Sequence, residues 1–173
     1  MAETMRDRGT FWTPAPAANA TIERGGFTAR FVDGFGQTLV SGNLDKAIAD
    51  LTPGLAEVGL WGLADDGSCA VRIARDRALL VTSAPLDIAA GWRDGYVATP
   101  CDDAYAVIEL SGPTLAEAVA EASAVDVEAG SPSASLLFAG ITALLYRTSP
   151  STARLHVERP LAAYLWTWLE NRR

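Results

Sequence analysis

The chain has few of the residues on which most catalytic and metal sites depend. Its 173 residues include one histidine, His156, and two cysteines, Cys69 and Cys101, which form no Cys-x-x-Cys motif. This count argues against a disulfide framework or a structural zinc site, because either needs several ligands at regular spacing. The sequence also has no Walker loop, no Gly-x-Ser-x-Gly elbow and no interleaving of basic and aromatic residues.

Positive charge and long apolar runs are scarce as well. Lys and Arg number 14 against 21 Asp and Glu, which gives a net charge of −7. Nucleic acids and anionic membranes are disfavoured as partners, because both require a basic face. No stretch approaches the roughly 20 apolar residues of a membrane span, and the first residues do not resemble a signal peptide. We therefore expect a cytoplasmic protein with no nucleic-acid or membrane partner.

The composition, 49% hydrophobic and 20% charged, is that of a globular chain. Pro14 and Pro16 exclude a regular helix near the start, so residues 1–20 are predicted to form an extended N-terminal arm. Residues 21–173 are predicted to form a single domain, with halves at about 21–99 and 100–173.

The clearest local signal is a strand, a tight turn and a helix. Residues 104–110 are mostly apolar and too few for a helix, and Ser111-Gly112-Pro113 then ends the run. Gly112 supplies the freedom for a turn, and Pro113 suits the first turn of a helix. From Leu115 onwards, apolar residues recur at helical spacing.

Other elements follow from similar signals. Two hairpins are predicted, one from residues 27–32 and 37–41 and one from residues 58–63 and 69–74 about the turn Asp65-Asp66-Gly67. A helix is predicted to begin after the N-cap Asn43. Further predictions are a strand at 79–82, a helix from Pro85 to about Trp92, a strand at 96–99, an edge strand at 154–157 and a last helix opened by Pro160. Residues 136–146 form either two strands about a tight turn or one strand with a bulge at Gly140. This alternation predicts an α+β fold of two related strand–helix–strand halves over mixed or antiparallel sheets.

The polar residues that could carry chemistry are each better explained structurally. His156 lies in the alternating segment RLHVE and is expected to be an ordinary strand histidine. Cys101 precedes Asp102-Asp103, which should raise its thiol pKa, and Cys69 is expected in the core. The two aspartates point opposite ways on an extended chain, so they do not share a site. No catalytic, cofactor-binding or metal-binding residue is predicted.

Three aromatic residues are candidates for contact with another subunit. Phe11 and Trp12 lie on a polar tail and either fold back on their own domain or dock on a partner. In the last helix, Trp168 lies on the same predicted apolar face as Leu161, Tyr164 and Leu165. Trp166 lies about 200° around the helix from Trp168, on the more polar side. We expect Trp166 to face outward as a subunit contact or to be partly covered by its own loops.

Two long segments carry a family resemblance. DDAYAVIELSGPTLAEAVAEASAVDVEAG (102–130) resembles a strand–Ser-Gly-Pro–helix–Asp segment of the gamma subunit of heterotetrameric sarcosine oxidase and of the folate-binding aminomethyltransferase (glycine-cleavage T-protein) superfamily. GITALLYRTSPSTARLHVERPLAAYLWTWLE (140–170) resembles that subunit's ending, and RALLVTSAPLDIAAGW (77–92) is a degenerate counterpart of its Trp-Leu-Leu-Val strand and helix. The Lys-Gly-Cys-Tyr-x-Gly-Gln signature is absent, and no acidic residue maps onto the T-protein's catalytic aspartate. VDVEAG also replaces the common Cys-Pro-x-Asp-Leu-like stretch.

The resemblance implies an aminomethyltransferase folate-binding-domain-like fold and a non-catalytic small subunit of a flavin-dependent amine oxidase or N-demethylase. It also implies larger flavin-binding and folate-binding partner subunits that carry FAD or FMN, NAD and tetrahydrofolate, with none of these bound by this chain. The alternatives are a stand-alone folate-binding aminomethyltransferase-like protein and a small-molecule-binding module of the same fold.

Overall fold

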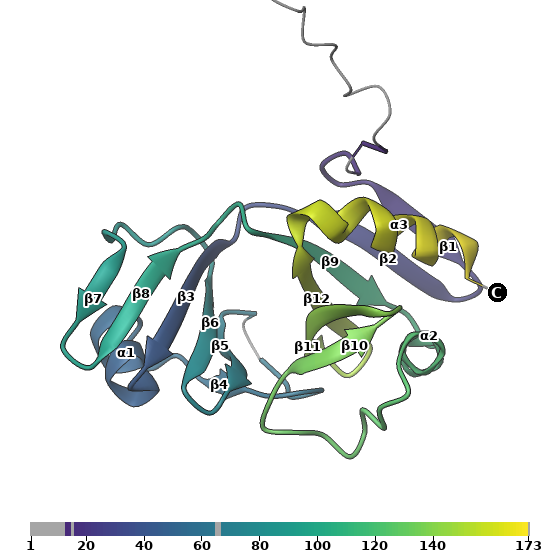
Figure 1. Cartoon of the computed structure of the whole chain (residues 1–173). Helices are drawn as coiled ribbons and strands as arrows, with labels where there is room; N and C mark the ends of the chain where they lie inside the picture. The colour runs from purple at the N-terminus through teal and green to yellow at the C-terminus, as the bar shows by residue number, and fades with distance from the viewer. Residues whose placement is uncertain (1–12, 15, 65–66, 173) are drawn as a thin grey trace, which may run out of the picture.

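The computed structural model describes residues 13–14, 16–64 and 67–172 and folds them into two six-stranded sheets with three α-helices (Figure 1). The first sheet is fully antiparallel, and its strands follow the order β1-β2-β9-β12-β11-β10. Their bounds are β1 Thr21–Arg24, β2 Phe27–Val32, β9 Tyr105–Ser111, β12 Thr152–Glu158, β11 Ile141–Ser149 and β10 Ser135–Phe138.

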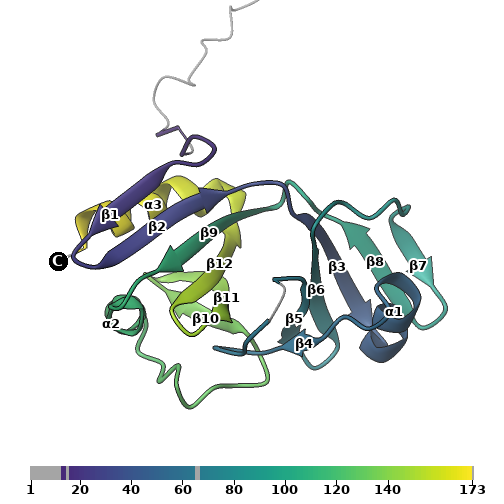
Figure 2. The ribbon, with the colours of Figure 1, turned by 180° about the vertical axis from the view of Figure 1, so that it is seen from behind.

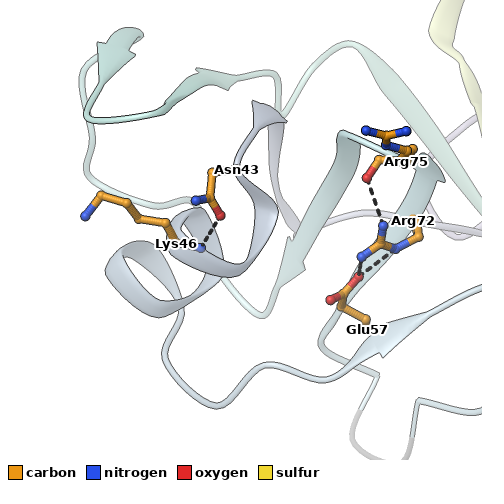
Figure 3. Close-up of polar contacts among 5 residues, drawn as sticks. All are labelled: Asn43, Lys46, Glu57, Arg72 and Arg75. Carbon is orange, nitrogen blue, oxygen red and sulfur yellow. Dashed lines mark hydrogen bonds and ion pairs between the residues drawn. The ribbon is translucent and has the colours of Figure 1, made fainter.

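The second sheet is mixed and has the order β4-β5-β6-β3-β8-β7, with only β4 and β5 parallel. Its strands are β4 Glu57–Val58, β5 Cys69–Ala74, β6 Arg77–Thr82, β3 Gly36–Gly42, β8 Tyr96–Pro100 and β7 Gly91–Arg93. Side-chain contacts hold the short parallel edge: Arg72 on β5 donates from its guanidinium to the Glu57 carboxylate on β4 and to the carbonyl of Arg75 (Figure 3).

Helices cover the outer face of each sheet, and the two inner faces meet. α2 (Leu115–Ala122) and α3 (Ala162–Asn171) pack on the first sheet, and α1 (Leu44–Leu51) packs on the second. A third core, which we call the seam, lies between the sheets and includes Cys69, Val71, Leu79, Leu144 and Tyr146. The layers are therefore helix, sheet, sheet, helix, and the predicted α+β class is confirmed.

The local sequence explains several elements as predicted. Asn43 caps α1, its side-chain oxygen accepting from the backbone N–H of Lys46 at 3.1 Å (Figure 3). The strand–turn–helix unit is confirmed as β9 and α2, and Gly112 in its turn has φ +124°, a value that favours glycine. β10 and β11 pair as a hairpin about Ala139 and Gly140, so the two-strand alternative is the correct one.

Tertiary pairing overturns other local expectations. Residues 27–32 and 37–41 do not form a hairpin, because Phe27–Val32 pairs with β1 and β9 in the first sheet, whereas Gly36–Gly42 pairs with β6 and β8 in the second (Figure 2). The chain crosses from one sheet to the other between them. Residues 154–157 do not form an edge strand either, since β12 lies between β9 and β11.

Two more predictions, a hairpin after residue 58 and a helix from Pro85, are wrong because these segments make other contacts in the fold. The predicted hairpin of 58–63 with 69–74 does not form, because the short β4 pairs with β5 in parallel. Leu60 and Leu63 instead form bridges to the other sheet's side of the chain, to Ser131 before β10 and to Arg147 on β11. The helix predicted from Pro85 is absent: residues 85–90 have no regular structure and lead into β7. α1 already covers the second sheet, and Ile88 packs against that core without needing a helix.

Candidate functional site at the seam between the sheets

The seam holds a polar network built around Gln37, whose residue is only 2% exposed. Gln37 comes from β3 of the second sheet and faces His156 on β12 of the first. Its amide oxygen lies 3.0 Å from His156 Nδ1, and its Nε2 donates to the carbonyls of Asp102 and Tyr105 at 3.2 and 3.1 Å. One side chain therefore joins the two sheets and the segment that crosses between them.

These contacts determine which imidazole nitrogen carries the proton. Because Gln37 uses its NH₂ group on two carbonyls, its oxygen must face His156 and accept from Nδ1–H. The other nitrogen, Nε2, is then an acceptor for the hydroxyl of Tyr146, which lies 3.2 Å away. The neutral His156 satisfies both of its ring nitrogens, so the network is complete without a ligand.

Burial sets the protonation states in this network. His156 is fully buried, and desolvation, followed by repulsion from Arg154, lowers its pKa from the ordinary value of 6.5 to about 3. Burial also raises the pKa of Tyr146 well above its usual range. A histidine that stays neutral at physiological pH and a tyrosine that stays protonated do not exchange protons easily. This geometry fits the prediction that His156 is an ordinary strand histidine, and it adds that the side chain is fully buried.

An open hollow of about 630 Å³ lies beside the network on the outer side of Tyr105. Its lining combines apolar groups with charged ones: Leu39, Cys101, Asp103, Ala104, Tyr105, Glu158, Arg159 and Pro160. Tyr105 and Glu158 are cross-strand neighbours, and both also line a smaller cavity of about 70 Å³ that reaches His156. The hollow and the network therefore meet at this pair of residues.

The acidic and thiol groups of this region have structural explanations. Asp102 does not merely face solvent: its Oδ1 accepts from the backbone N–H of Gln37 at 2.6 Å. Desolvation raises the pKa of the Cys101 thiol, with a smaller contribution from Asp102, so the predicted direction is correct but burial is its main cause. Cys69 is fully buried in the seam, as predicted. Among the described residues, no group of three or more His, Cys, Asp or Glu side chains could hold a metal ion.

The predicted contact residues lie elsewhere. Phe11 and Trp12 lie outside the described residues. Trp166 is 8% exposed and packs edge-on against Phe31 at 6.4 Å, so the expectation that it faces outward is wrong. The inward face of α3 is Ala162, Leu165, Trp166 and Leu169, a spacing of i, i+3, i+4 and i+7 that places Tyr164 outside. That spacing was readable in the sequence, whereas nothing in the sequence singled out Gln37.

No protein-family model and no curated protein matches the chain. Solved structures do resemble the chain in fold. One of them is a chain of the structure described as heterotetrameric sarcosine oxidase from Corynebacterium sp. U-96 in complex with pyrrole 2-carboxylate, with a TM-score of 0.63 and 17% identity. It covers 86% of this chain and 85% of that one. At this identity the similarity shows a shared fold. No described helix is long and apolar enough to cross a membrane.

Proposed function

We propose that this chain is a small, non-catalytic subunit, of the gamma type, in a hetero-oligomeric flavin-dependent amine oxidase or N-demethylase related to sarcosine oxidase. The observation that carries the proposal is the fold match, which spans 86% of this chain and 85% of the matched chain. Nearly equal coverage means that the two chains are close in length, so the match involves a whole small chain rather than a domain of a large one. The role of the chain is then to complete the assembly.

The seam supports a structural role. Its only histidine is buried and hydrogen-bonded on both ring nitrogens, and the accessible thiol, Cys101, has a raised pKa. Neither group is prepared for nucleophilic or acid–base work at neutral pH. The chain's polar groups at this position instead join the two sheets.

The cofactors are proposed to lie on the larger partner subunits. FAD, FMN and NAD carry phosphates, which proteins hold with basic side chains or helix N-termini. The hollow beside Tyr105 is lined by two acidic residues, Asp103 and Glu158, and by one basic residue, Arg159, whose Nε donates to the Asp103 carbonyl at 2.8 Å. The excess of acidic over basic residues in this lining disfavours a nucleotide. Binding of the N-methyl amine substrate and of tetrahydrofolate is likewise assigned to the partners.

The test is to purify the tagged chain from its native host and record the absorbance of the eluate. The expected result is larger chains, identified by mass spectrometry, that elute in fixed proportion with flavin bands and consume oxygen when an N-methyl amine is added. A colourless monomer with no amine-dependent oxygen consumption would contradict the proposal. If that monomer bound tetrahydrofolate in a titration, the stand-alone aminomethyltransferase-like alternative would replace it.

A further inference from the structure

One segment leaves the second sheet and lies on the first. Residues 59–64, which we call the strap, follow β4 and precede β5, and both of these strands belong to the second sheet. The strap itself contacts β11 of the first sheet, where Leu63 forms a parallel bridge to Arg147. It lies along the part of β11 that follows Leu144, the last residue paired with β10. The strap therefore fills a sheet edge whose N–H and C=O groups β10 leaves unpaired.

Backbone hydrogen bonds hold the strap along this edge. The N–H of Arg147 donates to the carbonyl of Gly62 at 2.7 Å, and the carbonyl of Arg147 accepts from the N–H of Ala64 at 2.8 Å. A longer bond, with 3.4 Å between nitrogen and oxygen, joins the N–H of Trp61 to the carbonyl of Leu145. None of these three bonds involves a strand of the second sheet, so they can break while both sheets keep their own pairing.

The backbone of the strap is strained at its centre. Trp61 has a φ of +60°, in the left-handed region, which is uncommon for a residue with a bulky side chain. Such a conformation persists only where the surrounding contacts hold it. Gly59, two residues earlier, fits closely as well, because a Cβ there would collide with the carbonyl oxygen of Ser131. The strap is therefore a tightly fitted segment in a conformation that its own sequence disfavours.

The side chain of Arg147 holds Trp61 in this conformation. Its Nε donates to the Trp61 carbonyl at 2.9 Å, and its guanidinium carbon lies 5.2 Å from the centroid of the Trp61 ring, within the range of a cation–π contact. The ring itself is only 9% exposed and packs in the core of the first sheet. Arg147 thus binds the strap through its main chain and its side chain, whereas the other strap contacts on β11 come from the main chain of Leu145 alone.

We propose that the strap is a latch on the first sheet: it opens from β11 and closes again as one unit while both sheets stay folded, and Arg147 keeps the closed form dominant. Opening relieves the strained backbone of Trp61 and breaks the contacts of a few residues only, so it costs less than unfolding the whole chain. The two ends of the strap stay attached, since β4 and β5 pair with each other. Because a free sheet edge can pair with another chain, the closed latch protects β11 from that pairing. The inference concerns this chain alone and goes beyond the proposed function.

The experiment is hydrogen exchange of single amides in the full chain, followed by NMR in low concentrations of urea. The N–H groups of Trp61, Ala64 and Arg147 report on the strap, and that of Leu80, which is fully buried on β6 between two strands, reports on global unfolding. The strap amides are expected to exchange at least about tenfold faster than Leu80 and to respond little to urea, because strap opening exposes little surface. Exchange of the strap amides at the rate of Leu80, with the same steep dependence on urea, would overturn the proposal.

A second arm tests Arg147 with a conservative variant. Arg147→Lys keeps the charge but loses the Nε bond and the planar group beside the Trp61 ring, so the strap amides should exchange about tenfold faster. Arg30→Lys is the matched control, because the ion pair of Arg30 with Glu109 at 2.8 Å does not involve the strap and is the same in its open and closed forms. That variant should leave the exchange of the strap amides unchanged. Unaltered exchange in Arg147→Lys, with the circular dichroism of the natural chain, would show that Arg147 does not keep the strap closed and would overturn the proposal.

Discussion

The ring of His156 stacks on the ring of Tyr146 inside the seam, with centroids 5.6 Å apart and planes inclined by 27°. The same pair is linked edge to edge, since the Tyr146 hydroxyl lies 3.2 Å from His156 Nε2. The two residues occupy adjacent strands of the first sheet, and Gln37 reaches them from the second. Because the three side chains are linked through hydrogen bonds to His156, a substitution of any one of them should weaken the contact between the two sheets and lower the stability of the fold.

The pH dependence of stability should report on His156. Its folded pKa of about 3 lies below the unfolded value of 6.5, so between these values the unfolded chain binds a proton that the folded chain does not. The contribution to stability is therefore fully present above about pH 6.5 and is lost as the pH falls toward 3, at about 1.4 kcal/mol per pH unit. Urea unfolding from pH 4 to 8 should show a shallower dependence in His156→Gln than in the natural chain. Parallel curves would show that His156 does not titrate in this way.

The hydrogen bonds of Gln37 should contribute more to the free energy of unfolding than the hydrogen bond between Tyr146 and His156. Gln37→Leu leaves His156 Nδ1–H and the carbonyls of Asp102 and Tyr105 without their partner, so we expect a loss of about 3 kcal/mol. Tyr146→Phe removes a single hydroxyl and should cost about 1 kcal/mol. Chemical denaturation of both variants measures the difference. Equal losses would mean that Gln37 is not the centre of the network.

Gly112 should tolerate no side chain. Its φ of +124° is unfavourable for other residues, and a Cβ there would collide with the carbonyl oxygen of Gly26 on the neighbouring turn. Gly112→Ala should therefore cost at least about 3 kcal/mol. Gly25 also has a positive φ, +57°, but a Cβ there meets no atom within 4 Å, so Gly25→Ala should cost about 1 kcal/mol. Thermal unfolding of the two variants side by side checks the contrast.

The two tryptophans of α3 should behave differently in the isolated chain. Trp166→Ala opens a cavity against Phe31 in the core and should reduce the free energy of unfolding by about 4 kcal/mol. Trp168 is only half-buried, so Trp168→Ala should cost about 2 kcal/mol in the isolated chain. If Trp166→Ala left the isolated chain as stable as before, its packing against the first sheet would not be the main role of that residue.

Local sequence signals are enough to predict several elements of this fold. The apolar run of β9, the Ser-Gly-Pro turn and the cap at Asn43 depend on neighbours within a few residues, and the structure confirms each of them. The α+β class follows from the same local alternation.

Strand pairing, in contrast, depends on long-range packing and could not be predicted from local patterns. β2 and β3 are consecutive in sequence but belong to different sheets, and β12 reads as an edge strand although it lies between two partners. Strand pairing is settled by which apolar faces can be buried together, and the alternation of one strand does not specify its neighbours. The seam network depends on the same choice, because Gln37 and His156 are 119 residues apart and meet only when the two sheets close on each other.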